Sequence, residues 1–145
     1  MKILKHCTQI IFVCLFASIL FVSCKEDDEK FPTFPAPVWN VNSAEYSVNM
    51  TAVVTLPQAL IQYAEEGDQL AAFSGDVCRG VGEIIDGLYY VAILGMPEDQ
   101  SNIHFRYYSI RNEYLYQTAD LFAFDADEIF GTTDEPETIE LSIVK

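Results

Sequence analysis

The stretch Y-S-V-N-M-T-A-V-V-T-L, residues 46–56, decides the expected fold class, because its apolar and polar side chains alternate. A period of two is typical of a β-strand that buries one face. Pro57 follows directly and lacks the N–H needed for a ladder hydrogen bond, so it should end the strand. The apolar face of this strand comprises Tyr46, Val48, Met50, Ala52, Val54 and Leu56.

The rest of the chain contains more short apolar segments separated by turn residues. Residues 59–66 suit one helical turn or a wide loop, and residues 119–130 suit a loop with one short strand. Asp86-Gly87 is a strong signal for a tight hairpin. The further expected strands are 69–74, 77–85, 88–94, 103–110, 113–117 and 138–144.

No segment shows about ten or more residues of helical periodicity, which a crossover between parallel strands would need. We therefore predict an all-β domain. Its expected form is an antiparallel β-sandwich of about seven to nine strands, immunoglobulin-like or jelly-roll-like.

The first 23 residues have the features of a secretory signal peptide. Lys2 and Lys5 are basic, residues 10–22 are nearly all apolar, and the small Ser23 precedes Cys24. The apolar stretch of 13 residues is too short for a spanning helix, which needs about 20 residues. We expect cleavage directly before Cys24.

The sequence F-V-S-C, residues 21–24, resembles the lipobox of bacterial lipoproteins, whose cysteine receives a diacylglycerol thioether and becomes the mature N-terminus. The following K-E-D-D, residues 25–28, resembles the export signal of surface lipoproteins of Bacteroidota. The resemblance implies lipidation of Cys24 and a position on the exterior of the outer membrane. Residues 24–37, acidic and then proline-rich, are predicted to form a lipidated tether, and residues 38–145 the sandwich domain.

Charge excludes one class of partner. Lys2 and Lys5 are lost with residues 1–23, which leaves six of the eight basic residues, all 22 acidic residues and a formal charge of −16 (6 − 22). Such a chain repels nucleic acid and anionic membrane surfaces, so the lipid is the expected link to the membrane.

The segment G-D-Q-L-A-A-F-S-G-D-V-C-R-G-V-G, residues 67–82, is similar to a pattern of extracellular modules in bacterial surface proteins. The later F-R-Y-Y and G-T-T-D-E-P-E-T-I-E-L stretches fit the same pattern. This resemblance implies a β-sandwich with no single activity. Independently of it, Gly80 and Gly82 should let a backbone or ring pack closely. Arg79 should either pair with a carboxylate such as Asp68 or Asp76, or bind an anionic ligand.

The residue inventory argues against an enzyme. Cys78 and His104 are the only cysteine and histidine after Cys24. We expect Cys78 to be an inert packed thiol and His104 to point to the polar face of its strand. No catalytic motif of the hydrolase, zinc-protease or phosphate-loop type is present, so no catalytic residue is predicted.

An acidic stretch offers a candidate metal site. Asp125, Asp127 and Glu128 lie close together in the segment D-A-D-E. Calcium accepts six to eight oxygen ligands from loops of this kind, although the spacing is not that of an EF-hand. The alternatives are a structural calcium ion and a solvated acidic loop.

Aromatic residues supply the candidate ligand site. Six tyrosines lie on three successive expected strands. If Ile103, Phe105 and Tyr107 face the core, the residues between them face outward, and a hairpin could pair these with the following strand. Tyrosine rings suit both sugar rings and protein hot spots. The predicted exposed platform is Arg106, Tyr108, Tyr114 and Tyr116, and the alternative is that these rings fill the ends of the core.

Trp39 follows the tether and is expected to pack on the first sheet. Together these features predict a non-catalytic binding or accessory module for a glycan or polysaccharide. The alternative is a structural or adhesin-type protein that binds another envelope or host protein.

Overall fold

The structure, a computed structural model, describes residues 30–145, and its compact unit runs from Phe31 to Lys145. The signal peptide and Cys24 lie outside the described residues. Neither helical element of the described part, the 3₁₀ turn η1 (Ser43–Glu45) or the helix α2 (Gln58–Ile61), is long and apolar enough to cross a membrane. The strands are β1 (Val48–Thr55), β2 (Gln69–Ser74), β3 (Val77–Ile85), β4 (Leu88–Gly95), β5 (Asn102–Ser109), β6 (Tyr114–Thr118), β7 (Phe122–Ala123), β8 (Ile129–Phe130), β9 (Glu137–Thr138) and β10 (Leu141–Ile143).

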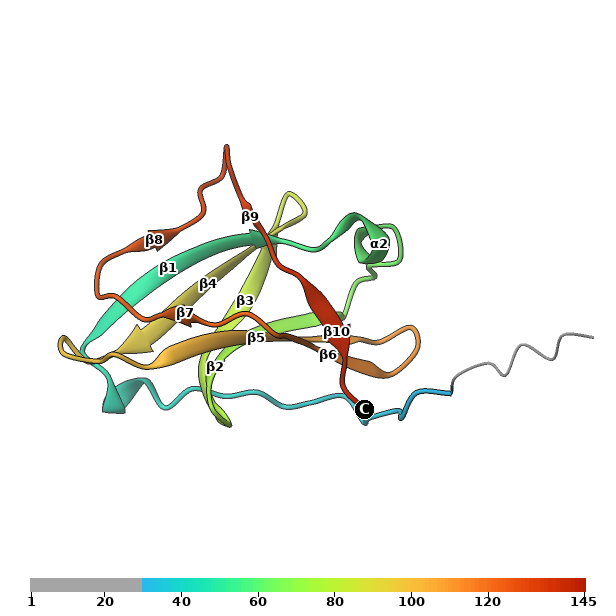
Figure 1. The fold of residues 1–145 in the computed structure, drawn as a ribbon, viewed down its shortest axis with the longest axis horizontal. Coiled ribbons are helices and arrows are strands. Elements are labelled where there is room, and N and C mark those ends of the chain that lie inside the picture. The colour runs from blue at the N-terminus through green and yellow to red at the C-terminus, as the bar shows by residue number, and fades with distance from the viewer. Residues whose placement is uncertain (1–29) are drawn as a thin grey trace, which may run out of the picture. The chain divides into compact units, whose positions relative to one another are not determined.

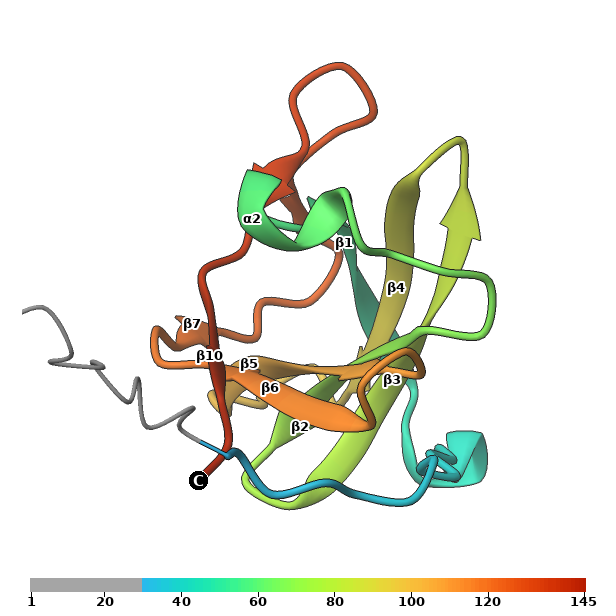
Figure 2. The same cartoon turned by 90° about the vertical axis from the view of Figure 1, so that its right-hand side faces the viewer.

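The strands form one continuous path in the order β10-β6-β5-β2-β3-β4-β1-β8, with β7 added to β5 and β9 to β1. Figures 1 and 2 show that this path curls, so that β1, β4 and β3 lie on one side of the interior and β2, β5 and β6 on another. The all-β prediction is confirmed. The strands form one curled sheet, so the finer sandwich form stays a prediction.

Most neighbouring strands are antiparallel, as expected, but two pairings differ. The short strands β8 and β9 both lie parallel to β1, with Thr51 opposite Ile129 and Val54 opposite Glu137. The loop between β7 and β8 and the segment after it return the chain to the same edge of β1. No crossover helix is needed, because strands β2 to β7 make the connection from β1 to β8, and β9 then continues along the same edge.

Turn chemistry fixes the long hairpin. Asp86 and Gly87 join β3 to β4, and both have positive φ (51° and 82°), as a type I′ turn requires. Ile85 and Leu88 then face each other directly. The predicted hairpin is therefore confirmed, and strands β2 and β3 begin and end where the sequence placed them.

The core lies inside the curl. Alternate residues of β1 and its flanks point into it, as the opening stretch predicted: Met50, Ala52, Val54 and Leu56 are buried, and Tyr46 and Val48 are half-buried. Burial of such side chains contributes roughly 1.5–3 kcal/mol each. The other buried core residues on strands are Leu70, Ala72, Tyr89, Val91, Ile93, Ile103, Phe105, Tyr107 and Tyr116.

Residues 31–46, here called the strap, cover the opposite face of the sheet. Figures 1 and 2 show the strap running along β2, β5 and β6 on the side away from β1. The Phe34 N–H donates to the Glu113 carbonyl (2.8 Å), and the Trp39 ring meets Phe73 edge-on at 5.5 Å. The packing of Trp39 on the sheet is confirmed. The prediction that residues 31–37 are tether is wrong, because this segment packs on the domain.

Candidate functional site

The predicted platform is not formed as one surface. In the β5–β6 pairing, Tyr107 lies opposite Tyr116 and Ser109 opposite Tyr114. Tyr114 and Tyr116 therefore share the inner face of the sheet with Tyr107, whereas Arg106 and Tyr108 lie on the outer face. The prediction of a shared exposed face is wrong, because the register differs by one residue from the one it assumed.

Burial removes two of the four platform residues from solvent. Tyr108 is only 2% exposed, because the strap covers it and the Phe34 carbonyl accepts a hydrogen bond from its hydroxyl at 3.1 Å. Tyr116 is 7% exposed and packs against Tyr107, with ring centroids 5.7 Å apart. Tyr114 is half-buried, and its ring meets the Phe31 ring edge-on at 5.9 Å. The alternative reading, rings that fill the core and cover the sheet, describes these tyrosines better.

Arg106 is engaged on the outer face. Its guanidinium lies 4.4 Å from the centroid of the Phe73 ring and donates to Asp76 at 2.7 Å. Asp76 is fully exposed, and the hydrogen bond and charge of Arg106 lower the pKa of its carboxyl. This surface pair adds little stability.

His104 lies on the outer face of the sheet with Arg106, as expected, but it is buried there. It is 6% exposed, stacks on Phe73 at 5.8 Å, and its Nε2 has no hydrogen-bond partner in residues 30–145. Burial lowers the pKa of its imidazole, Arg106 lowers it further, and Asp76 opposes the shift.

We expect stability to fall on mild acidification. A histidine whose folded pKa lies below its unfolded value of about 6.5 binds protons more readily when unfolded, so stability is lost as pH falls through this region. Urea unfolding of residues 25–145 should give a lower unfolding free energy at pH 5.5 than at pH 7.5. His104→Phe should flatten this dependence, since His104 is the only histidine after residue 23. An unchanged slope in the variant would assign the dependence to other groups.

Cys78 and His104 cannot act as a nucleophile and its base. Both pair with Phe73, from β3 and β5 respectively, so they lie two strands apart. The backbones of two such strands lie about 9–10 Å apart, and Cys78 Sγ instead donates to the Gly80 carbonyl at 3.8 Å. Burial raises the pKa of the half-buried Cys78 thiol, which disfavours the thiolate.

Arg79 pairs with neither predicted carboxylate. Its Nη2 binds Asp99, and its Nε donates to the Leu94 carbonyl at 2.6 Å. The rings of Tyr46 and Phe124 lie 4.6 and 5.6 Å from the guanidinium. The prediction named Asp68 or Asp76, which are nearer in sequence, whereas the Asp99 loop reaches Arg79 across the sheet. Arg79 is thus a buried structural cation.

The three predicted metal ligands, Asp125, Asp127 and Glu128, do not form a metal site. Within residues 30–145, no three His, Cys, Asp or Glu side chains lie close enough together to hold a metal ion. Asp127 takes positive φ (66°), and its N–H and the Glu128 carbonyl bond to the backbone of β1. Asp125 instead lies at a hollow of about 480 Å³ with Glu98 and Asp99.

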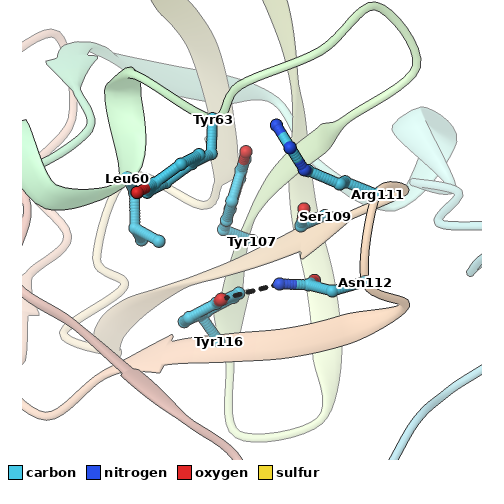
Figure 3. Close-up of a pocket in the computed structure, with 7 residues that line it drawn as sticks. All are labelled: Leu60, Tyr63, Tyr107, Ser109, Arg111, Asn112 and Tyr116. Carbon is cyan, nitrogen blue, oxygen red and sulfur yellow. Dashed lines mark hydrogen bonds between the residues drawn. The ribbon is translucent and has the colours of Figure 1, made fainter.

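A tyrosine-lined pocket of about 330 Å³ lies between α2 and the β5–β6 hairpin. Figure 3 shows Leu60 and Tyr63 approaching from the α2 side, opposite the side chains of the hairpin. The pocket is small but falls within the usual range of small-molecule sites, about 300–1,000 Å³. We call it the tyrosine pocket; its lining residues are Leu60, Tyr63, Tyr107, Ser109, Arg111, Asn112 and Tyr116.

The inner wall of this pocket is held in place by Asp68. The Tyr107 hydroxyl donates to Asp68 Oδ2, and the N–H groups of Glu65 and Ile110 donate to the same carboxylate at 2.9 and 2.8 Å. Burial and the Asp68 charge raise the pKa of Tyr107, so its hydroxyl stays neutral. The wall therefore presents a fixed phenol.

The outer wall is open to solvent. Tyr63 is 51% exposed, and the Arg111 guanidinium lies 5.4 Å from its ring centroid. Asn112 Nδ2 donates weakly to the Tyr116 hydroxyl at 3.5 Å (Figure 3). Aromatic rings edged by amide and guanidinium groups provide stacking and hydrogen bonding in one small volume.

Of the predicted ligand residues, only Tyr116 lines the tyrosine pocket. Tyr63 was missed, because residues 59–66 have no periodicity that would place a side chain. Its aromatic type beside the Gly67-Asp68 turn was the available signal.

Comparison of the chain with protein-family models finds no match, and searches of the curated proteins and of the solved structures find none either.

Proposed function

We propose that the protein is a surface lipoprotein of the outer membrane whose domain is a non-catalytic module that binds a glycan. The lipobox-like F-V-S-C, residues 21–24, and the acidic K-E-D-D that follows support the location. The module reading is supported by the separation of Cys78 from His104 and by the lack of a group of metal ligands within residues 30–145.

The observation that carries the glycan proposal is the tyrosine pocket. Three of its seven lining side chains are tyrosines, and Arg111, Asn112 and Ser109 add polar groups around them. A pyranose ring offers C–H faces for stacking and hydroxyls for hydrogen bonds, which matches this lining. The small volume suits one sugar unit better than a long run of polysaccharide.

We expect Tyr63→Ala to weaken glycan binding by about tenfold or more, because the exposed ring is the only stacking surface on the outer wall; tenfold corresponds to about 1.4 kcal/mol. The measurement is a glycan-array screen with residues 25–145, which contain the whole compact unit, followed by calorimetry on any hit.

Tyr90→Ala is the matched control. Tyr90 is a half-buried tyrosine on β4 whose hydroxyl lies 3.1 Å from the Thr133 hydroxyl, away from the pocket. Its replacement should leave binding unchanged. Equal losses in both variants, or undiminished binding in Tyr63→Ala, would remove the tyrosine pocket as the site.

One observation favours the alternative, a protein-binding role. Strand β3 and its turn expose several apolar side chains in close succession: Val77, Val81, Ile84 and Ile85. Val81 and Ile85 share one face of the strand and Ile84 lies on the other, and exposed apolar side chains of this kind suit a protein contact. A blank glycan screen from a folded domain would favour this function over the first.

A further inference from the structure

We propose that the tyrosine pocket selects an acidic sugar unit, whose carboxylate or sulfate group binds Arg111 in place of Glu65. The inference rests on the proposed glycan function and names its ligand class. Three observations on the pocket lead to it: the balance of hydrogen-bond groups, the state of Arg111, and the engagement of the other arginines.

The pocket lining is rich in donors. Arg111 carries only donors, Asn112 Nδ2 offers N–H groups, and the Tyr116 hydroxyl, which accepts from Asn112, can still donate its proton. Ser109 can act either way. A ligand that fills this pocket must therefore supply acceptor oxygens.

The amide and carboxylate oxygens around the pocket already accept hydrogen bonds, which leaves mainly hydroxyl oxygens as acceptors. Asn112 Oδ1 accepts from the Tyr114 N–H at 3.2 Å. Both oxygens of Asp68 accept hydrogen bonds, one of them from the Tyr107 hydroxyl, whose proton is thereby committed. A neutral sugar hydroxyl must donate as well as accept, and it finds few free acceptors here. An anionic oxygen group only accepts, and so fits the lining better.

Arg111 is available for exchange. Its guanidinium lies 3.5 Å from Glu65 Oε1, and the two side chains are 54% and 47% exposed. An ion pair this long and this exposed contributes little. A ligand carboxylate or sulfate could take its place with shorter, two-pronged contacts, while the Tyr63 ring stays stacked on the guanidinium.

The other arginines after residue 30 are engaged elsewhere. Arg79 is buried against Asp99, and Arg106 pairs with Asp76 on the outer face. The acidic surface repels anions at long range, but this repulsion is screened beyond about 8 Å at physiological ionic strength. Short ligands with one acidic group are therefore favoured over polyanions.

The test compares matched sugars on residues 25–145 by chemical-shift titration. The probes are glucose, glucuronate and glucose 6-sulfate, and the affinities of the last two identify the anionic group. At least one of the anionic sugars should bind about tenfold or more tightly than glucose. Arg111→Gln should abolish this preference.

Glu65→Gln gives the sharper readout, because removing the competing carboxylate should tighten binding of the anionic sugar by severalfold. Glu66→Gln is its control: Glu66 is exposed, and its replacement changes the net charge equally. Equal effects of the two variants would overturn exchange at Arg111.

The two levels of the proposal fail in different ways. If glucose binds as tightly as the anionic sugars, or if Arg111→Gln leaves a preference for them intact, the acidic-sugar inference is wrong, while the glycan function stands. If no sugar binds on the array and none shifts a resonance of the pocket in the titration, the glycan function itself is wrong.

Discussion

Replacing Asp99 with alanine is expected to lower the free energy of unfolding by about 3–5 kcal/mol, the usual cost of leaving one member of a buried ion pair without its partner. Arg79 would keep its charge beneath Tyr46 and Phe124, where solvent hardly reaches it. Asp99 also accepts from the N–H and hydroxyl of Ser101, so the loop after β4 would loosen as well. Urea unfolding of residues 25–145, followed by circular dichroism, measures the change.

Asp76→Ala is the matched control, because it removes the carboxylate of the second arginine pair. Asp76 is 96% exposed, and Arg106 would keep its hydrogen bond to Gln117 Oε1 at 3.2 Å, so the unfolding midpoint should hardly move. Similar losses in the two variants would show that the burial of Arg79 is not the source of the effect.

The contribution of Asp99 should depend on pH. Burial alone would raise the pKa of its carboxyl, but the hydrogen bonds from Ser101 and Arg79 outweigh burial and lower it. The contribution is therefore present above the unfolded pKa of about 3.9 and is lost as pH falls through the folded value. The difference between the wild type and Asp99→Ala should shrink below about pH 4.

Local sequence patterns predicted most of the sheet. Alternation in residues 46–56 predicted the buried face of β1. The Asp86-Gly87 turn predicted the hairpin between β3 and β4, the strand that pairs with β1. These features depend on side chains a few residues apart, so a single sequence contains them. The two-residue strands β7, β8 and β9 were not predicted in detail, because they form only through pairing with β5 and β1.

The candidate site depended on information that is not local. The turn between β5 and β6 spans four residues, including Glu113 at positive φ (59°), and sets the register that puts Tyr116 inside. The strap that buries Tyr108 comes from the other end of the chain. The tyrosine pocket unites α2 with the β5–β6 hairpin, and no sequence period links Tyr63 to Arg111.

Phe124→Ala is expected to cost about 3–5 kcal/mol of unfolding free energy, as usual for a buried phenylalanine. Phe124 lies in the stretch that the sequence left ambiguous, yet it is 3% exposed, and its N–H donates to the Ser101 carbonyl at 2.8 Å. Its ring occupies the space above Gly95, at the end of β4. The loop after β7 therefore supplies the Phe124 ring to the core beside Gly95 of β4, which has no side chain of its own.

Gly95→Ala should reveal this relation. A Cβ at residue 95 would come within 2.3 Å of the Phe124 ring, so the single variant should lose about 1–3 kcal/mol through overpacking. In the double variant with Phe124→Ala, the new methyl group occupies space that the ring has left. The double loss should then fall short of the sum of the single losses by about 1 kcal/mol or more.

Gly82→Ala combined with Phe124→Ala supplies the comparison for this cycle. A Cβ at residue 82 would approach Leu70, Tyr89 and Val91 at 3.1–3.4 Å, with no contact to Phe124. The losses at residues 82 and 124 should therefore add. Additivity in the Gly95 cycle as well would mean that the ring does not rest on β4. Coupling at Gly95 alone would show that Gly95, the last residue of β4, makes room for the Phe124 ring that closes the core.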